Sequence, residues 1–310
     1  MELIRGIHNI RQEHKGCVLT IGNFDGVHLG HQAVLKQVIA KAKALGYPAT
    51  VMTFEPQPLE VFSPDTAPAR LTRLRDKYVH LAELGVERLL CVRFNPAFAA
   101  MTPQAFVERL LVEKLGVKFL VVGDDFRFGQ KRSGDFAYLE EQGQKLGFEV
   151  VSTHSFCLSA QRVSSTLIRN ALANDELGQA ESMLGRPYSI AGRVAHGNKL
   201  GRTIGFPTAN VQLKRLVSPV SGVYAVRVLG LPEGIKGGVA NVGNRPTVDG
   251  VRQQLEVHLF DYSADLYGKQ IEVQLLHKLR NEVKFASFDA LKAQIELDAQ
   301  AARDWLAEHE

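Results

Sequence analysis

The order of apolar and polar positions along the first 152 residues predicts alternating strands and helices. Continuous apolar runs, which are typical of buried strands, occur at 17–22, 49–54, 88–94, 117–122 and 148–152. Between them, apolar residues recur at helical spacing in the segments 30–45, 71–84, 103–115 and 136–146. Apolar strands separated by amphipathic helices predict an α/β fold with a doubly wound parallel sheet that is covered on both faces. Such sheets bind their ligands beyond the carboxyl ends of the strands.

The pattern changes after a short helical segment, 175–184, that ends at Gly185-Arg186-Pro187. Glycines then become dense, and strand-like runs follow with no helical pattern between them, at 188–195, 222–229, 235–242, 253–260 and 270–277. The last 25 residues or so carry the apolar spacing of a helix. Short strands with glycine-rich turns predict an antiparallel barrel or sandwich. We therefore place a boundary here, giving the domains 1–185 and 186–310.

Composition narrows the class of protein. The net charge of +4, from 37 basic and 33 acidic residues, gives no case for nucleic acid as the main partner. Cys17, Cys91 and Cys157 each lie in an apolar run, which indicates buried free thiols in a reducing compartment. The N-terminal residues show no secretory signal, and no apolar run approaches the ~18 residues that span a membrane. The sequence therefore predicts a cytoplasmic protein without a membrane or nucleic-acid partner, and it does not indicate the oligomeric state.

A candidate phosphate-binding turn lies between the first predicted strand and the first predicted helix. It reads GNFDGVHLGH, and its candidate ligand-binding residues are Gly22, Asn23, Phe24, His28, Gly30 and His31. The glycines allow a ligand to approach the backbone closely, and the helix N-terminus favours anions. His28 and His31 share one side of the first helical turn and can donate hydrogen bonds to phosphate oxygens. The alternative, a turn with two surface histidines, is disfavoured by the strand–turn–helix context.

Two further loops follow predicted strands at the same edge of the sheet. After Phe54, Pro56 and Pro58 stiffen an extended course, and Phe62 either stacks on a flat ring or folds back on the core. The loop from Gly123 to Gly134 is polar, aromatic and bounded by glycines, which is typical of a ligand-binding loop. Asp124 there either caps a turn or faces the ligand. The candidate residues of this loop are Asp125, Arg127 and Phe128.

The segment 162–169, which reads RVSSTLIR, begins another predicted helix. Ser164 or Ser165 is a natural N-cap for this helix. Capping explains one hydroxyl, but it does not require three hydroxyls with an arginine one turn later. That set, in which we single out Ser165, Thr166 and Arg169, would converge on a polyphosphate at a helix N-terminus.

The second half of the chain has a constellation of its own. Its glycine loop can wrap a polyphosphate with Gly197, Lys199, Gly201 and Arg202. Thr208 and Asn210 offer neutral oxygen ligands of the kind that suits Mg²⁺, and a second glycine turn is predicted at 239–247. Glu256 and His258 share one face of the run 253–260. A carboxylate that looks into a small barrel can take a proton from an attacking alcohol, although pattern alone favours an outward, solvated face.

The motifs of both halves, in this order, resemble those of the bacterial bifunctional riboflavin kinase/FAD synthetase family. HxGH with SSTxIR is similar to the nucleotidylyltransferase signature, with Val163 where isoleucine is usual. GNFDGVHLGH, TFEPQP, VGDDFRFG and RVSSTLIR resemble the FAD synthetase module, whereas GRTIGFPTAN, NVGNRPT, LEVHLFD and LRNEVKF resemble the riboflavin kinase module. The resemblance covers about residues 15–300. It implies a nucleotidylyltransferase-like α/β domain, a C-terminal antiparallel β-barrel with a terminal helix, ATP and Mg²⁺ as cofactors, and riboflavin, FMN and ATP as substrates.

The resemblance also implies a role for each candidate residue. In the adenylyltransferase, His28 and His31 are catalytic, and the ATP-binding set is Gly22, Asn23, Phe24, Gly30, Ser165, Thr166 and Arg169. The flavin there contacts Pro56, Pro58, Phe62, Asp125, Arg127 and Phe128. In the kinase, Glu256 is the general base, Thr208 and Asn210 hold Mg²⁺, and ATP is bound by Gly197, Lys199, Gly201, Arg202, Thr208 and Asn210. The flavin-binding set of the kinase is Arg280, Glu282 and Phe285.

Three alternative functions have weaker support. A monofunctional nucleotidylyltransferase with a non-catalytic barrel does not account for PTAN together with Glu256. A flavin carrier has no need of two phosphate-binding signatures. A class I tRNA synthetase also uses HxGH, but the chain has no KMSKS-like segment.

Overall fold

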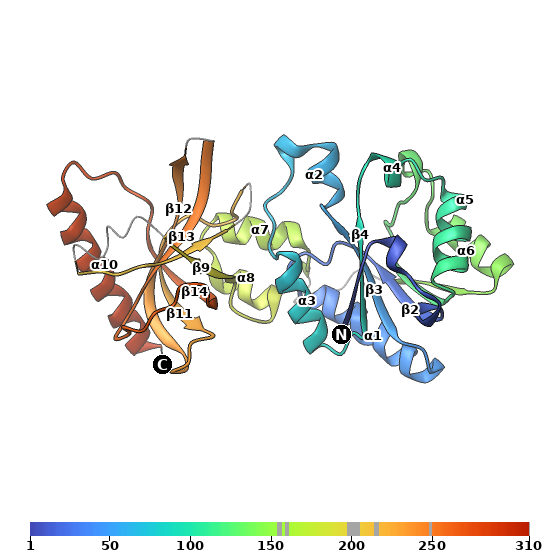
Figure 1. The fold of residues 1–310 in the computed structure, drawn as a ribbon, viewed down its shortest axis with the longest axis horizontal. Helices are drawn as coiled ribbons and strands as arrows, with labels where there is room; N and C mark the ends of the chain where they lie inside the picture. Colours follow the sequence, from blue (N-terminus) through green and yellow to red (C-terminus); the bar gives the residue numbers. More distant parts are fainter. Residues whose placement is uncertain (154–156, 159–160, 197–204, 214–216, 248–249, 310) are drawn as a thin grey trace. The chain divides into compact units, whose positions relative to one another are not determined.

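The computed structural model describes residues 1–153, 157–158, 161–196, 205–213, 217–247 and 250–309 (Figure 1). Internal contacts divide the chain into two compact units. The first consists of Met1–Pro68 and Thr72–Ser164, and the second of Ala69–Leu71 and Ser165–Glu310. The functional boundary expected at residue 185 remains a prediction.

The first unit contains the predicted parallel sheet. Its strands are β1 (Glu2–Arg5), β2 (Cys17–Ile21), β3 (Ala49–Glu55), β4 (Arg88–Arg93), β5 (Val117–Gly123) and β6 (Glu149–Thr153). They lie in the order β1-β4-β3-β2-β5-β6, and every neighbouring pair is parallel. The chain builds the sheet from β2 toward one edge and then returns to place β5 on the other side of β2. The carboxyl end of β2 is therefore the switch point at which ligands bind in such sheets.

Helices cover both faces of this sheet (Figure 1). The longer ones are α1 (Leu29–Leu45), α3 (Leu74–Glu83), α6 (Phe136–Leu146), and α5 (Pro103–Ala105), which continues into the π-helix η4 (Phe106–Lys114). Val18 and Val121 pack on α1, whereas Leu19 and Leu120, the next residues along the strands, belong to the cluster formed with η4 and α6. This alternation is what a strand buried on both faces requires.

The remaining elements of the first unit are short. They are the helices α2 (Pro58–Phe62) and α4 (Pro96–Ala99), the 3₁₀ turns η1 (Ile7–Asn9), η2 (Gln12–His14), η3 (Pro64–Thr66) and η5 (Gln130–Arg132), and the ribbon of β7 (Cys157–Leu158) and β8 (Gln161–Arg162).

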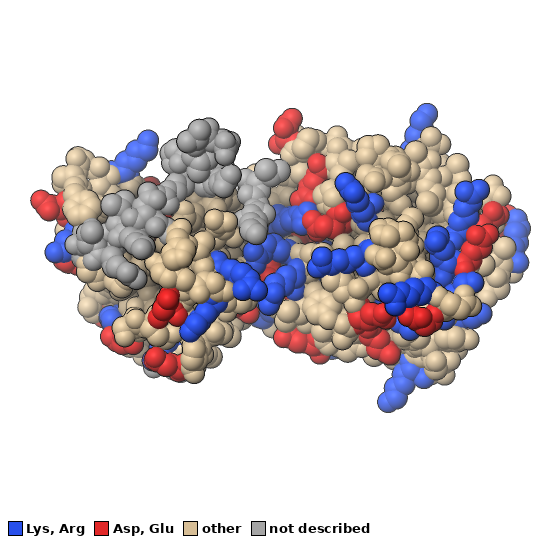
Figure 2. Space-filling model, viewed as in Figure 1, with Lys and Arg blue, Asp and Glu red and all other residues tan. Residues whose placement is uncertain are grey.

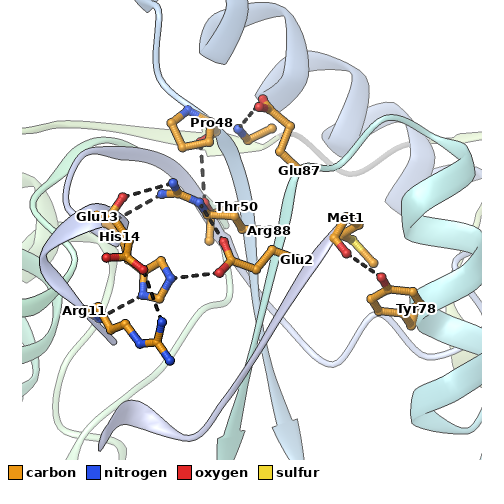
Figure 3. A network of polar contacts seen from close by, with 11 residues as sticks. Met1, Glu2, Arg11, Glu13, His14, Pro48, Thr50, Tyr78, Glu87 and Arg88 are labelled. Atoms are coloured by element: carbon orange, nitrogen blue, oxygen red, sulfur yellow. Dashed lines mark hydrogen bonds and ion pairs between the residues drawn. The ribbon is translucent and has the colours of Figure 1, made fainter. Parts of the chain in front are cut away.

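Strand β1, at one edge of the sheet, was not predicted, and polar contacts hold it in place (Figure 3). The Glu2 carboxylate lies 2.9 Å from Nε2 of the buried His14 and 3.4 Å from Nε of Arg88. The Arg88 guanidinium also donates to the carbonyls of Glu13 and His14, at 3.1 and 3.2 Å. The Tyr78 hydroxyl donates to the carbonyl of Met1. A charged four-residue segment thus becomes a strand through contacts with residues distant in the sequence.

Within the described residues, the second unit is a closed antiparallel barrel with three helices. Its strands are β9 (Ser189–Ala195), β10 (Ala209–Gln212), β11 (Gly222–Leu229), β12 (Lys236–Thr247), β13 (Gly250–Leu259) and β14 (Gln270–Arg280). They close in the order β10-β13-β12-β11-β14-β9. The helices are α7 (Ser165–Ala173), α8 (Leu177–Leu184) and the terminal α10 (Phe288–Glu308). The barrel and its terminal helix are confirmed.

The barrel interior is mostly aliphatic and also holds the fully buried Tyr224 of β11. Leu255 and Val257 of β13 and Val226 of β11 are fully buried. The opposite face of β11 and β12 packs on α10, where Val223 and Val239 meet Ala302 and Leu306. Alternate residues of each strand therefore fill the barrel or face outward, toward α10 or the segments beside it.

One strand of the barrel was not predicted, and one expectation about local structure was wrong. No strand was predicted at 209–212, but this segment forms β10, which closes the barrel between β9 and β13. The glycine turn expected at 239–247 is instead part of the long strand β12. Gly243 serves there to leave space, because a Cβ at this position would overlap the Glu282 carboxylate.

On the face drawn in Figure 2, basic and acidic side chains are interspersed. Within the described ranges, no helix is long and apolar enough to cross a membrane. Cys17 and Cys91 are buried free thiols, and burial raises the pKa of the Cys17 thiol to about 12.

Candidate functional site

The GNFDGVHLGH turn follows β2 at the switch point of the parallel sheet. It leaves the strand at Gly22, whose amide donates to the carbonyl of Met52 on β3 at 3.1 Å. The turn then enters α1 with His28 as N-cap. The predicted strand–turn–helix context is confirmed.

The backbone of this turn is held in an uncommon conformation. Phe24 and Val27 have φ of 47° and 42°, values that β-branched and bulky residues rarely adopt, and Gly26 has φ of 86°. The buried Asp25 carboxylate accepts from the amide and the hydroxyl of Thr72 at 2.9 and 3.2 Å, and the Thr72 hydroxyl accepts from the Gly26 amide at 2.9 Å. Such strain persists only where the surroundings impose it, which is common at functional sites.

His28 and His31 lie side by side at the start of α1. Their rings stack with centroids 3.6 Å apart and planes inclined by 18°. Nδ1 of the buried His28 accepts from the His31 amide at 3.3 Å, which fixes the orientation of its ring. A Cβ on Gly30 would come within 3.1 Å of His28 Nδ1 and 3.3 Å of the Val163 carbonyl. Gly30 therefore gives the His28 ring its space.

His31 has an unused hydrogen-bonding atom. Its Nδ1 is shielded from solvent and has no hydrogen-bond partner among the described residues. Burial, followed by the charges of His28 and Lys77, lowers the pKa of His31 well below its ordinary value. The ring is thus a neutral imidazole at neutral pH, and it can exchange a hydrogen bond with a ligand at the helix N-terminus.

Lys77 of α3 is a charged residue that sequence analysis missed. It is almost fully buried, and its Nζ lies 3.4 Å from the Thr53 hydroxyl, which donates to the Asn23 carbonyl at 3.3 Å. The Lys77 ammonium therefore supports the turn through the Thr53 hydroxyl. The sequence signal was weak, because one lysine in an amphipathic helix usually faces solvent.

The loop after β3 exposes an aromatic side chain. Pro56 precedes α2 and Pro58 is its first residue, while Phe62 ends the helix and is 62% exposed. The Phe62 ring packs edge-to-face with that of Phe94, with centroids 5.5 Å apart. Of the two readings of Phe62, the one that folds it back on the core is therefore wrong.

The loop after β5 separates its three candidate residues. Asp125 and Arg127 are exposed, but Phe128 is buried between Phe106 and Phe126, with centroid distances of 5.0 and 5.6 Å. Gly134 lies directly against the Phe128 ring. Phe128 therefore anchors the loop from within the core, and Asp125 and Arg127 are left for a ligand. Asp124 accepts from the Ser152 hydroxyl, which ties the loop to β6.

The second phosphate-binding signature lies on α7, in the second unit. Ser165 is the first residue of the helix, Thr166 is exposed, and Arg169 follows one turn later. Nε of Arg169 donates to the Ala69 carbonyl at 2.6 Å, so that part of its guanidinium is used to hold residues 69–71.

In the barrel, strand register brings three polar residues into one row. Glu256 of β13 pairs with Asn210 of β10 on one side and with Asn241 of β12 on the other. Directly paired residues of antiparallel strands project to the same face, with side chains roughly 5 Å apart. Because Leu255 and Val257 fill the interior, this row lies on the outer face of the barrel. Of the two alternatives for Glu256, the structure therefore shows the outward face that the pattern alone favours. Periodicity shows which residues share a face but not which face is inside.

Asn210 is held by its neighbours. Its Nδ2 donates to the Thr208 carbonyl at 3.3 Å, and its Oδ1 accepts from Nε2 of Gln254. The oxygen donors of Thr208, Asn210 and the adjacent Glu256 are of the kind that Mg²⁺ takes when it is bound mainly by phosphates and waters. The described residues contain no cluster of three or more His, Cys, Asp or Glu that would hold a metal without such a substrate.

The segment after β14 carries the predicted flavin-binding residues. Arg280 makes a forked ion pair with the buried Asp298 of α10, with Nε and Nη2 at 2.9 and 2.7 Å from its two oxygens. Glu282 reaches back over β12 and accepts from Nδ2 of Asn241 at 3.2 Å. Phe285 lies beside the guanidinium, 5.7 Å from its ring centroid to Cζ. Arg280 thus fixes the start of the segment, and Glu282 places it beside the Glu256 row.

A cavity of about 520 Å³ opens next to this segment, between residues 175–178 and the end of β14. The Lys278 ammonium crosses it to the Asp175 carboxylate at 2.7 and 2.8 Å. Arg280 and Asn281 line its other end.

Gly197, Lys199, Gly201 and Arg202 lie outside the described residues. Sequence analysis in turn missed Asp298, Gln254 and Asn241. Only Asn241 carried a signal, because it lies in the NVGNRPT motif.

Comparison with known proteins relates both units to enzymes of flavin metabolism. A FAD synthetase family model matches residues 10–167, and a riboflavin kinase family model matches residues 184–306. The bifunctional riboflavin kinase/FMN adenylyltransferase of Escherichia coli K12 is 60% identical over 306 residues, and that of Haemophilus influenzae is 55% identical over 303, each alignment covering 98% of both chains. A crystal structure described as a macrolide-efflux protein from Streptococcus pneumoniae matches with a TM-score of 0.80 at 30% identity, covering 98% of this chain and 100% of that one.

Proposed function

The chain belongs to the bifunctional riboflavin kinase/FMN adenylyltransferase family, and on that premise we propose which of its residues carry each reaction. The enzyme phosphorylates riboflavin with ATP to give FMN and ADP, and it adenylylates FMN with a second ATP to give FAD and pyrophosphate. We assign adenylyl transfer to residues 1–185 and phosphorylation to residues 186–310. The separate matches of the two family models support this division.

In adenylyl transfer, an FMN phosphate oxygen attacks the α-phosphorus of ATP, and the bond from that phosphorus to the pyrophosphate oxygen breaks. His28 and His31 stabilise the charge that develops on the departing phosphates. Support comes from the neutral His31 ring and its unpartnered Nδ1 at a helix N-terminus. Gly22, Asn23, Phe24 and Gly30 form the backbone of this ATP site, and Ser165, Thr166 and Arg169 contribute to triphosphate binding.

The flavin of this reaction is recognised by Pro56, Pro58 and Phe62 after β3, and by Asp125 and Arg127 after β5. The exposure of Phe62 supports a stacking role, since an aromatic face left open to solvent can cover the flat isoalloxazine ring. Phe128 contributes indirectly, because its buried ring holds the loop that carries Asp125 and Arg127.

In the kinase reaction, Glu256 accepts the proton of the ribityl hydroxyl while that oxygen attacks the γ-phosphorus of ATP and the bond to ADP breaks. Its place in one row with Asn210 and Asn241 carries this assignment, because the row joins a carboxylate to a neutral oxygen donor in PTAN. Arg280, Glu282 and Phe285 bound the flavin, and Gly197, Lys199, Gly201 and Arg202 bind the ATP phosphates.

Mg²⁺ fits the oxygen donors of Thr208 and Asn210, and when bound there it would neutralise charge on the ATP phosphates. Gln254 supports this role by orienting Asn210. The buried free thiols of Cys17 and Cys91 support function in the reducing cytoplasm.

The test is a time course with the full chain, riboflavin, ATP and Mg²⁺, in which the flavins are separated. FMN should rise before FAD, and added FMN should give FAD without riboflavin. No conversion of riboflavin would contradict the kinase assignment, and no conversion of FMN the adenylyltransferase assignment.

A further inference from the structure

Asn241 stands beside the proposed base of the kinase reaction. Register pairing places it directly across from Glu256, on the same outer face of the barrel. On its other side lies Val223 of β11, so Asn241 ends the run of adjacent polar residues that begins at Asn210. A side chain at this position can contact the same substrate as Glu256.

The side-chain oxygen of Asn241 accepts no hydrogen bond from the described residues. Oδ1 is shielded from solvent and has no hydrogen-bond partner among the described residues. A buried acceptor without a partner costs free energy, so that proteins rarely keep one without a reason. A bound ligand that donates an O–H or N–H would satisfy it.

Glu282 fixes which end of the amide faces that ligand. Nδ2 of Asn241 donates to the Glu282 carboxylate at 3.2 Å. A carboxylate only accepts hydrogen bonds, and therefore the NH₂ end must point to Glu282 and the oxygen away from it. Gly243 makes this contact possible, because a Cβ there would overlap the Glu282 carboxylate. Asn241 is thus preoriented as an acceptor.

We propose that Asn241 Oδ1 accepts a hydrogen bond from a hydroxyl of the ribityl chain of riboflavin, and so holds the chain with its reacting hydroxyl at Glu256. This inference rests on the proposed kinase site. The donor is assigned to the chain and not to the flavin ring, because the acceptor lies next to the group that takes the proton of the attacking alcohol.

The test replaces Asn241 with Leu, which has nearly the same size and no polar atom. The KM for riboflavin in FMN formation should rise about tenfold, the value of one ordinary hydrogen bond. The KM for ATP should not change. A flavin that carries a methyl group in place of the ribityl chain should compete with riboflavin as before, with an unchanged inhibition constant. FAD formation from added FMN should also stay at the parent rate.

Thermal unfolding separates a substrate-binding role of Asn241 from a structural one, because loss of a structural residue would lower the melting temperature. Asn241→Leu removes an unsatisfied buried acceptor, and the melting temperature of the ligand-free protein should stay the same or rise. Asn9→Leu is the matched control: Asn9 is exposed, lies in the first unit and donates to the Arg5 carbonyl, and its loss should leave both KM values unchanged. Should the Leu variant fail to fold, Asn241→Val, which favours strands and carries no polar side-chain atom, should show the same kinetic changes.

Two results would overturn the proposal. One is an unchanged KM for riboflavin in the folded variant. The other is an equal weakening of riboflavin and the methyl-substituted flavin, which would assign Asn241 to the ring or to the local fold. Failure of the kinase assignment looks different, because the parent protein would then form no FMN at all.

Discussion

The ion pair between Arg280 and Asp298 allows a quantitative prediction, because it ties the end of β14 to the terminal helix. Asp298 accepts from Arg280 through both oxygens, at 2.7 to 3.1 Å, and from Gln294 Nε2 at 2.9 Å. Asp298→Asn keeps the size of the side chain but removes its charge and one acceptor atom. The Arg280 guanidinium would then face a neutral amide.

The expected loss is about 2 kcal/mol. Removing one partner of a fully buried pair costs about 3–5 kcal/mol, but the Arg280 side chain is 22% exposed and water can replace part of the interaction. At about 1.4 kcal/mol per decade, this lowers the folding equilibrium constant of the barrel unit roughly 30-fold. For a unit of this size the melting temperature should fall by about 4–8 °C.

Trp305, the single tryptophan of the chain, provides the assay. It lies on α10 and packs against the barrel, and its fluorescence in urea should therefore follow unfolding of this unit. Asp304→Asn on the same helix is the control: Asp304 is exposed and accepts only from Gln300 among the described residues, so its loss should cost less than about 0.5 kcal/mol. If both variants unfold at the same urea concentration, the ion pair does not stabilise the barrel. Because Arg280 also begins the proposed flavin segment, Asp298→Asn should raise the KM for riboflavin and leave FAD formation from FMN unchanged.

Four further outcomes test the two sites. His31→Ala should slow FAD formation from FMN by roughly 10²–10³-fold while FMN formation continues, and unchanged FAD synthesis would make the histidines scaffolding. Glu256→Gln should slow FMN formation by roughly 10²–10⁴-fold with riboflavin and ATP still bound, and a parent-like rate would remove Glu256 from the mechanism. Because folding lowers the pKa of His31, the unfolded chain binds one more proton than the folded chain at acidic pH. The stability of the first unit should therefore fall as the pH drops below about 6.5, by at most about 1.4 kcal/mol per pH unit. Calorimetry of His31→Gln should show a smaller dependence of stability on pH. A fragment of residues 186–310 should fold and convert riboflavin to FMN without forming FAD; if only residues 165–310 do so, α7 and α8 belong to the kinase.

The elements that could be predicted are those whose structure is determined by neighbouring residues in the sequence, and the missed elements depend on contacts with distant residues. The strands β2 to β5 contain apolar runs, and burial on both faces is visible in any such run. Strand β1 reads Glu-Leu-Ile-Arg and is a strand through its pairing with β4, where Glu2 also meets Arg88 and His14, residues distant in the sequence. Strand β10 was missed for a similar reason, since its four residues are strand only through pairing with β9 and β13.

The candidate sites divide in the same way. His28 and His31 were predictable because motif, turn and helix start are contiguous. Asp298 was not, because eighteen residues separate it from Arg280 and an acidic residue on an amphipathic helix usually faces solvent. For Glu256, alternation identified the neighbours that share its face, but the closure of the barrel decided that this face is the outer one.

Gly30 and Gly243, one in each proposed site, are glycines because of the space around them. Neither Gly30 nor Gly243 has a positive φ, and the backbone alone does not require glycine at either position. At Gly30 a side chain would press on the His28 ring, and at Gly243 it would displace the carboxylate that orients Asn241. In both cases the adjacent polar residue has a buried atom without a described partner, His31 Nδ1 and Asn241 Oδ1. These glycines thus preserve the space in which the side chains of the two proposed sites are held in their orientation. At both positions we infer that glycine is required by the proposed site and not by the backbone.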